Sequence, residues 1–297
     1  MAEANQNRGK ESEAGKRLKK TVEELVRLST IPVSLKKILE VIENERASHK
    51  DLVSAIEHDQ SLASRIVSMA NTAFYGYARE VKDIQTAVTI LGFNMVRNLA
   101  ISTSLFKLNG NHGAMADKLR KLWTHSYEVA VASALIAERT GLAKKDEAFL
   151  SGLIADIGRV ILYQIYGEVY MKVSNYGREG LLIREEEAFG GDHQMVGAWF
   201  LNHYKFSKEC VISLKEHHTP EKFLSDYRSG SLQLIAIVYI ADIITTRNRE
   251  GFEFDLSRSA SHEEIMEAIY LDEAGAKEIE DIMANMEDSI SGFYAAG

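Results

Sequence analysis

Proline is almost absent from this sequence, since only Pro32 and Pro220 occur among its 297 residues. An average usage of ~5% would place about fifteen prolines in a chain of this length. Turn-dense all-β folds need many such turn residues. The scarcity of proline therefore argues against an all-β fold and favours long helices.

The sequence also has a single cysteine, Cys210. One cysteine excludes a disulfide within the chain and any zinc or iron–sulfur site built on several thiolates. A lone thiol fits a reducing compartment, and we expect a cytoplasmic protein.

Long apolar runs are missing as well. The longest charge-free apolar stretch, residues 232–241, is well short of the ~18 to 20 residues that a membrane-spanning helix needs. The first twenty residues are polar and lack the apolar core of a secretory signal. No membrane association is therefore expected.

Basic residues are not in excess either: 35 Lys and Arg stand against 43 Asp and Glu, and only Lys16 to Lys20 form a cluster. Residues 51–71 have the pattern of a helix-turn-helix motif, but they carry one arginine against three acidic residues. Contacts to phosphates need clustered Lys and Arg, so nucleic acid is not expected as a partner.

What the sequence does contain is apolar residues at helical spacing along most of its length. This periodicity predicts helices over residues 18 to about 30, 35–42, 48–57, 61–73, 83–91, 94–105, 118–140, 146–162, 193–204, 207–218 and 232–246, with a mostly helical region after Ser261. Residue types typical of helix ends mark several boundaries. The expected N-terminal caps are Ser48 with Asp51, Asp59 or Ser61, Asp83, Asp146 and Asp192, and the expected C-terminal glycines are Gly92 and Gly141.

The glycine- and asparagine-containing stretch from Lys107 to Ala116 is the clearest loop in the sequence. We place a boundary there, because a chain of this length exceeds the ~100 to 200 residues of one domain. The predicted organisation is a polar tail over residues 1–20, an N-terminal helical part over 21–110, and a larger helical part over 111–297.

Two carboxylates lie on the apolar faces of predicted helices. Asp156 shares its face with Leu153 and Val160, and Asp242 lies on an equally apolar face. Burying an ionised carboxylate costs several kcal/mol unless it is paired. The simple explanations are pairing with Arg159 or Arg247, or capping of a neighbouring helix end, and a bound metal ion is the other explanation.

Several histidines occupy similar positions. His125 points to the apolar face of its helix, His193 stands in the first turn of another helix, and the pair His217 and His218 ends a third. Taken alone, each is explained as a satisfied core histidine. Together with the two carboxylates they suit a divalent transition metal such as zinc, iron, manganese or nickel. The other five histidines lie in polar contexts and are expected to be solvated: His49, His58, His112, His203 and His262.

The order of these residues resembles the HD superfamily of metal-dependent phosphohydrolases, and in particular the HD-GYP phosphodiesterase layout. The motifs are GLIADIGR around Asp156, DHQMVGAW around His193, EHH at residues 216–218 and IADII around Asp242. Upstream, IPVSLKKILEVI, HDQSLASRIVSMAN and AVTILG resemble the HDOD family, the HD-related output domains of bacterial signalling. The resemblance implies an all-α, phosphodiesterase-like helical bundle with a smaller N-terminal helical sub-domain.

The resemblance also implies where a metal would bind. His125, Asp156 and Asp242 would belong to one site, and His193, His217 and His218 to an adjoining one, with Asp156 able to bridge them. The sequence departs from the pattern at Ala155, which stands where the first residue of the His-Asp doublet would be. Arg159 replaces the lysine that often follows the doublet, and no Gly-Tyr-Pro follows His218.

These departures favour a catalytically degenerate signal-transduction module over an enzyme. We expect such a module to bind a signalling protein in trans or a small phosphate-containing ligand, with partial occupancy by a divalent transition metal. No sensor or receiver pattern occurs in these residues, which is why the signal is expected to arrive in trans. The alternative is an active metal-dependent phosphohydrolase, acting for example on a cyclic dinucleotide.

Overall fold

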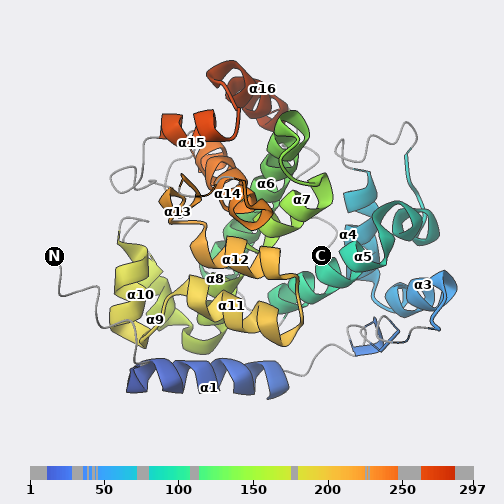
Figure 1. Cartoon of the computed structure of the whole chain (residues 1–297). Helices are drawn as coiled ribbons and strands as arrows, with labels where there is room; N and C mark the ends of the chain where they lie inside the picture. The colour runs from blue at the N-terminus through green and yellow to red at the C-terminus, as the bar shows by residue number, and fades with distance from the viewer. Residues whose placement is uncertain are drawn as a thin grey trace.

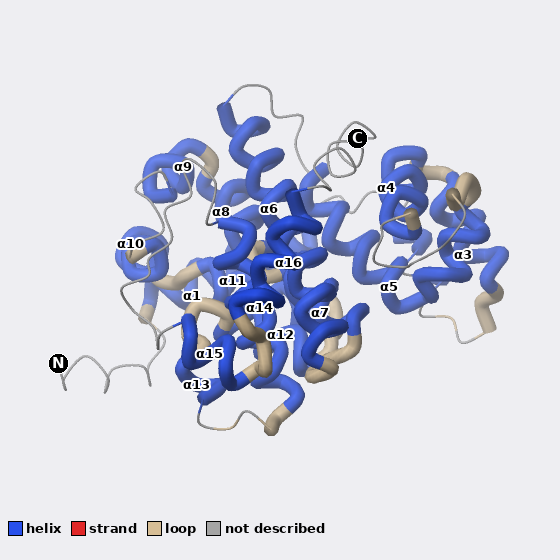
Figure 2. Tube along the Cα trace, turned by 90° about the horizontal axis from the view of Figure 1, so that it is seen from above, coloured by secondary structure: helices blue, strands red, loops and turns tan. Residues whose placement is uncertain are grey.

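The computed structural model describes residues 12–28, 36–38, 40–41, 44, 46–71, 80–107, 114–174, 180–224, 226, 228–246 and 262–284. Every regular element within these ranges is a helix (Figure 1). Figure 2 shows the same helices from above, without any strand in the described part of the chain. The prediction of an all-α fold is confirmed.

Before the predicted boundary loop the described helices include α1 (Glu13–Leu28), α3 (His49–Glu57), α4 (Gln60–Ala70) and α5 (Ile84–Lys107), and residues 36–38 and 40–41 are also helical. Those after it are α6 (Ala114–Thr140), α7 (Lys145–Ile154), α8 (Ile157–Tyr166), α9 (Glu168–Ser174), α10 (Leu181–Phe189), α11 (His193–His203), α12 (Lys208–Glu216), α13 (Glu221–Leu224), α14 (Gly230–Thr246), α15 (His262–Ala268) and α16 (Glu273–Ala284). Most of the predicted loop, residues 108–113, lies outside the described ranges.

Helices α3, α4 and α5 pack on one another at one end of the molecule (Figure 2). The caps predicted for α3 and α4 are present: Ser48 and Asp51 form a complete capping box, and Asp59 accepts a hydrogen bond from the backbone N–H of Leu62. Leu52, Ile56 and other apolar residues of α3 and α4 are buried, so this helix pair contributes to the core.

Gly92 sharply bends α5. Its φ of 75° and ψ of 164° are not helical, and they separate the two helical stretches that the sequence predicts on either side of this residue. Only glycine adopts this combination of angles readily, because it has no Cβ to clash with the backbone.

Helix α1 begins at Glu13 and therefore includes residues 13–20 of the segment expected to be a polar tail. It packs against α8, α10 and α11, far along the sequence, and Leu18 and Val22 are buried there (Figure 1). The close approach depends on Gly190, since a Cβ at this position would lie 2.5 Å from the Cβ of Ala14.

The larger part is built around α6, which is buried along most of its length and packs against α7 and α14. Helix α12 packs between α14 and α11, and α11 in turn packs on α8. Helices α15 and α16 lie against the far end of α14, and α16 also reaches α6 (Figure 1). Helix α7 packs against α6, α12 and α14, and α8 packs against α11, so these helices surround the junction between α7 and α8.

The single helix predicted over residues 146–162 is wrong in two respects. It begins after Lys144, so Asp146 lies in the first turn and is not the cap. It also breaks at Ala155 and Asp156, where α7 ends and α8 begins, with Asp156 at φ −97° and ψ 12°. The two halves follow different neighbours: Gly152 brings α7 against α6, and Gly158 brings α8 against the start of α11.

Within the described ranges, Lys145–Tyr166 is the one stretch that is long and apolar enough to cross a membrane by composition. The break at Asp156 divides it, and 83% of its most apolar window is buried within the fold. Burial against the surrounding helices accounts for its apolar character.

Candidate metal centre

The structure brings all six predicted site residues into one buried region. His125 comes from the middle of α6, Asp156 from the turn between α7 and α8, and His193 from the first turn of α11. The other three residues are His217 and His218 at the end of α12, and Asp242 on α14. Five of them are buried, and His218 is partly buried.

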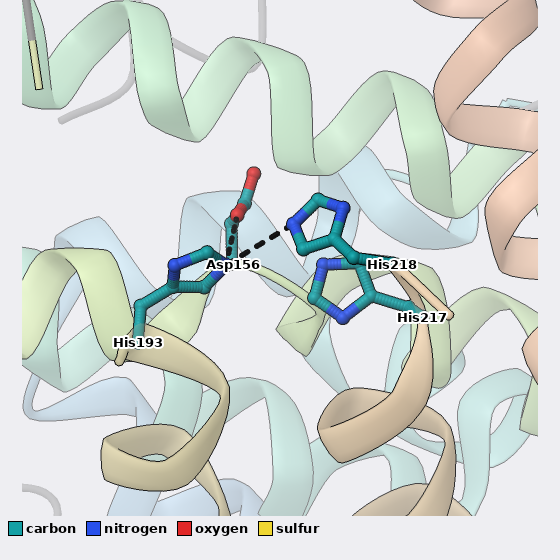
Figure 3. Close-up of side chains that lie close together, drawn as sticks. All are labelled: Asp156, His193, His217 and His218. Carbon is teal, nitrogen blue, oxygen red and sulfur yellow. Dashed lines mark hydrogen bonds and ion pairs between the residues drawn. The ribbon is translucent and has the colours of Figure 1, made fainter. Parts of the chain in front are cut away.

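Four of these residues present possible ligand atoms to a common point. The ligand atoms of Asp156, His193, His217 and His218 all lie within 4.8 Å of one another (Figure 3). His193 Nε2 is 3.2 Å from His218 Nε2 and 3.6 Å from the Asp156 carboxylate. Tetrahedral coordination with bonds of about 2.0 to 2.1 Å places ligand atoms roughly 3.3 Å apart. The donor types and these two distances therefore match those of a transition-metal site.

His125 and Asp242 form a separate pair beside this cluster. His125 Nε2 is 2.8 Å from Asp242 Oδ1 and 3.7 Å from Asp156 Oδ2. A cavity of about 10 Å³ adjoins the pair and is lined by Ala155, Gly152 and His217 among others. A space of that size holds about one water molecule. Ala155 therefore leaves a gap, but one too small for phosphate.

Local structure explains how the histidines of the cluster are presented. Asp192 caps α11 by accepting from the backbone N–H of Met195, and this fixes His193 in the first turn. His217 Nδ1 donates to the backbone carbonyl of Leu214 at 2.7 Å, which leaves its Nε2 free to act as a ligand.

One residue of the site, Glu185 on α10, was not predicted from the sequence. Its carboxylate is fully buried and lies 2.7 Å from His193 Nδ1. The available signal was its position four residues from both Leu181 and Phe189, which puts a carboxylate on an apolar helix face. The same reasoning identified Asp156 and Asp242.

Arg159 is the charge partner that the sequence analysis suggests for Asp156. Its Nη1 lies 3.4 Å from Asp156 Oδ2. Burial opposes the charge of the guanidinium, but the Asp156 carboxylate together with Tyr170, Tyr163 and Glu185 outweighs it, so the pKa of Arg159 is raised. Asp156 thus has one oxygen facing a permanent cation and the other facing the histidine cluster. Arg247, the partner suggested for Asp242, lies outside the described residues.

The three histidines of the cluster have different charge preferences. Burial works against the charged form of His193, but the charge and hydrogen bond of Glu185, together with the Asp156 carboxylate, outweigh it and raise the pKa of this histidine. Burial lowers the pKa of His217, and burial together with the neighbouring histidines lowers the pKa of His218 well below its usual value. Neutral imidazoles are the form that binds metals.

The remaining histidines lie away from the cluster. His58 and His203 are exposed, as predicted, and His112 lies outside the described residues. His49 and His262 are only partly exposed, because their rings contact the Thr89 hydroxyl and the Tyr239 hydroxyl, respectively. These two histidines therefore keep part of their surface in water, while one side of each ring contacts a hydroxyl.

The family model described as HDOD domain matches residues 28–220. The chain belongs to the HDOD family. The matched segment of this HDOD protein includes five of the six site residues and Glu185, whereas Asp242, α1 and the helices from α13 onward lie outside it or at its edge.

Two solved structures share the fold. A candidate signal transduction protein from Marinobacter aquaeolei VT8 is 20% identical, with a TM-score of 0.63 over 93% of this chain and 61% of that one. A candidate metal-dependent phosphohydrolase from Shewanella amazonensis SB2B is 17% identical, with a TM-score of 0.64 over 95% of this chain and 98% of that one.

An uncharacterized protein of Treponema pallidum (strain Nichols) is 23% identical over 232 residues, which cover 76% of this chain. The aligned region spans 44% of the Treponema protein, less than half of its length.

Proposed function

We propose that this HDOD protein is a signal-transduction module that has lost hydrolytic turnover and acts by binding a ligand or partner at or near a metal centre. The observation that carries the proposal is the division of the six site residues into two unequal groups. Four converge as possible ligands, while His125 and Asp242 pair directly with each other beside Ala155.

In this proposal Asp156, His193, His217 and His218 hold one divalent transition metal. The donor set of three imidazoles and one carboxylate suits zinc, iron, manganese or nickel. Such an ion would supply Lewis acidity and a site for an anionic oxygen when bound. The family resemblance and the similarity in fold to a candidate metal-dependent phosphohydrolase support the assignment of a metal, though not its identity.

The residues around Ala155 support the loss of turnover. A second ion would need ligands from His125 and Asp242, which lie 2.8 Å apart, and from the position of Ala155. Ala155 offers no ligand atom, and the adjoining cavity accommodates about one water molecule. Hydrolysis that requires two metal ions would therefore lack one ligand for the second ion.

The proposed function of the site is to bind a small ligand or a partner protein without hydrolysing it. Arg159 stands next to the cluster with its guanidinium directed at Asp156, so a small phosphate-containing ligand reaching the ion would meet a second positive charge there. A signalling protein binding in trans would sense the occupied or unoccupied state. This role agrees with the candidate signal transduction protein of similar fold.

An active phosphohydrolase is the second candidate function. The observation that favours it is the cluster itself, because three histidines and an aspartate are retained in ligand geometry. One metal ion can activate water by lowering its pKa, so a mononuclear site does not exclude hydrolysis in principle.

The test compares the full-length protein with Ala155→His and Asp156→Ala, each purified without metal-chelate steps. Metal content is measured by elemental analysis, and hydrolysis of a generic phosphodiester and of cyclic dinucleotides is measured with manganese or iron added. We expect metal in the wild type, more in Ala155→His and little in Asp156→Ala, with negligible wild-type hydrolysis.

Robust wild-type hydrolysis that is lost in Asp156→Ala would replace the proposal with the phosphohydrolase alternative. The same low metal content in all three proteins would mean that the six residues form an ordinary polar core.

A further inference from the structure

Glu185 has no exposed surface, and both of its carboxylate oxygens are engaged. Oε2 accepts a hydrogen bond from the backbone N–H of His193 at 2.9 Å and lies 2.7 Å from the ring Nδ1 of the same residue. Oε1 accepts from the hydroxyl of Tyr170 at 2.6 Å. A carboxylate with three donors is stabilised in its charged form despite burial.

Capping of α11 does not by itself account for this arrangement. Asp192 already caps the helix through the backbone N–H of Met195. The N–H of His193 is one of the unpaired donors found at every helix start, and a water or a short polar side chain could satisfy it. A buried carboxylate from another helix is a costly alternative, and it also contacts the imidazole ring.

The contact between Glu185 and the His193 ring determines which ring nitrogen faces the other possible metal ligands. With Nδ1 directed at Glu185, Nε2 points in the opposite direction, toward Asp156 and His218 (Figure 3). The hydrogen bond at one ring nitrogen selects which tautomer is present and so which nitrogen can bind a metal. Rotation of the ring away from this orientation would break the contact with Glu185.

Tyr170, on α9, holds the Glu185 carboxylate in place. Its ring is fully buried, with the Tyr163 ring edge-on at 4.6 Å and the Phe189 ring at 5.9 Å between centroids. The hydroxyl is therefore fixed where it meets Glu185. The chain of contacts runs from Tyr170 on α9 through Glu185 on α10 to His193 on α11.

We propose that Glu185, held by Tyr170, is the positioning residue of the metal centre: its carboxylate fixes the orientation and tautomer of His193 and thereby sets the affinity of the site for a transition-metal ion. This inference rests on the proposed metal site and extends it to a residue that donates no ligand. A contact of this kind typically contributes 10- to 100-fold to metal affinity.

The experiment titrates Co²⁺ into full-length protein stripped with a chelator, and follows both the affinity, by chelator competition, and the visible absorption of the bound ion. Glu185→Gln keeps the shape of the side chain and removes its charge, and Tyr170→Phe removes one hydrogen bond to it. Glu187→Gln is the matched control, because Glu187 is exposed on the same helix. Thermal melting of each stripped protein reports folding.

We expect Glu185→Gln to weaken Co²⁺ binding by about 10- to 100-fold and to alter the absorption spectrum, since the electron donation of His193 changes. Tyr170→Phe should give a smaller loss in the same direction, and Glu187→Gln should match the wild type. A purely structural role would lower the melting temperature without changing the spectrum of the bound ion.

The outcomes separate the two proposals. Wild-type protein that binds no Co²⁺ would overturn the metal site and this inference with it. Wild-type binding with unchanged affinity and spectrum in Glu185→Gln would overturn the inference alone. If Glu185→Gln does not fold, Tyr170→Phe decides, and unchanged affinity and spectrum there would count against the positioning role.

Discussion

Asp156 lies in the two-residue turn between α7 and α8, and its two oxygens face different partners. Oδ2 is directed at Arg159 and His125, and Oδ1 at His193. A helical conformation through this position would point the carboxylate along the face of a continuous helix. The turn instead places it at the junction of the four-residue cluster and the His125–Asp242 pair.

The neighbouring Ala155 gives a prediction about packing. Ala155→His places an imidazole against a cavity of about 10 Å³, and overpacking a core typically costs about 1 to 3 kcal/mol. We expect the stripped variant to be less stable than the wild type by about this amount in urea unfolding. Added Zn²⁺ should restore more stability to the variant than to the wild type, because the new ring gains a ligand role. Equal stabilisation of both proteins would show that the imidazole does not reach the ion.

Cys210 provides a prediction about reactivity. The side chain is 2% exposed, its sulfur lies 3.7 Å from the Ser151 hydroxyl, and burial raises the pKa of the thiol. Because the thiolate is the reactive species, a thiol reagent should modify the native protein at least about 100-fold more slowly than the urea-unfolded chain. With a reagent that releases a chromophore when it reacts with a thiol, absorbance measures both rates. Fast modification of the native protein would mean that α12 opens readily.

The sequence identified six of the site residues but not all of the contacts between them. Histidines and carboxylates on apolar faces are visible as exceptions to the helical pattern, and the six predicted in this way lie together. Glu185 carries the same signal, but EEE at residues 185–187 looks like a solvated acidic run, and only the contact with His193 distinguishes its first member. The direct pairing of His125 with Asp242 depends on how two distant helices pack, which no local pattern encodes.

Among the helices, α4 offers a test of capping apart from the site. Asp59 Oδ1 accepts from the backbone N–H of Leu62 at 3.0 Å, so Asp59→Ala removes a cap that is typically worth about 1 kcal/mol. We expect lower stability in chemical unfolding and an unchanged metal content. Asp51→Ala, which breaks the capping box of α3, should behave in the same way. Loss of metal without loss of stability would place Asp59 in the functional site.

The bend in α5 gives a second prediction for a single element. Gly92→Ala meets no atom within 4 Å of its new Cβ, so its cost is conformational. At φ 75° and ψ 164° we expect a loss of stability at the upper end of about 1 to 3 kcal/mol. Gly180→Ala, at φ 66° and ψ 15°, tests the milder left-handed region and should cost about 1 to 2 kcal/mol. A Gly92 variant as stable as the wild type would mean that the bend relaxes.

The existence of the helices was predictable from periodicity, but their interruptions were predictable only where glycine marks them. Gly92 and Gly141 end helical stretches at positive φ, as expected. The break at Ala155 and Asp156 has no glycine or proline, and an unbroken apolar pattern runs through it. It results from the different neighbours of α7 and α8, α6 on one side and α11 on the other.

For the whole molecule, the order of helices in space differs from their order in the sequence. Helix α1 comes before the α3–α5 group in the chain, yet it packs on α8, α10 and α11 (Figure 1). The predicted boundaries followed composition along the chain, so they assigned the last part of α1 to the N-terminal helical part. Its amphipathic stripe showed that α1 would be buried, but not against which surface.

The docking of α1 has a consequence for solubility. The family match begins at residue 28, where α1 ends, so the matched segment does not include the helix that covers this face of α8 and α11. A chain lacking residues 1–28 would expose the apolar surface now buried by Leu18 and Val22. We expect it to self-associate in light scattering, whereas a chain lacking only residues 1–11 should scatter like the intact protein. A monodisperse, monomeric product from the longer deletion would show that the surface beneath α1 tolerates water.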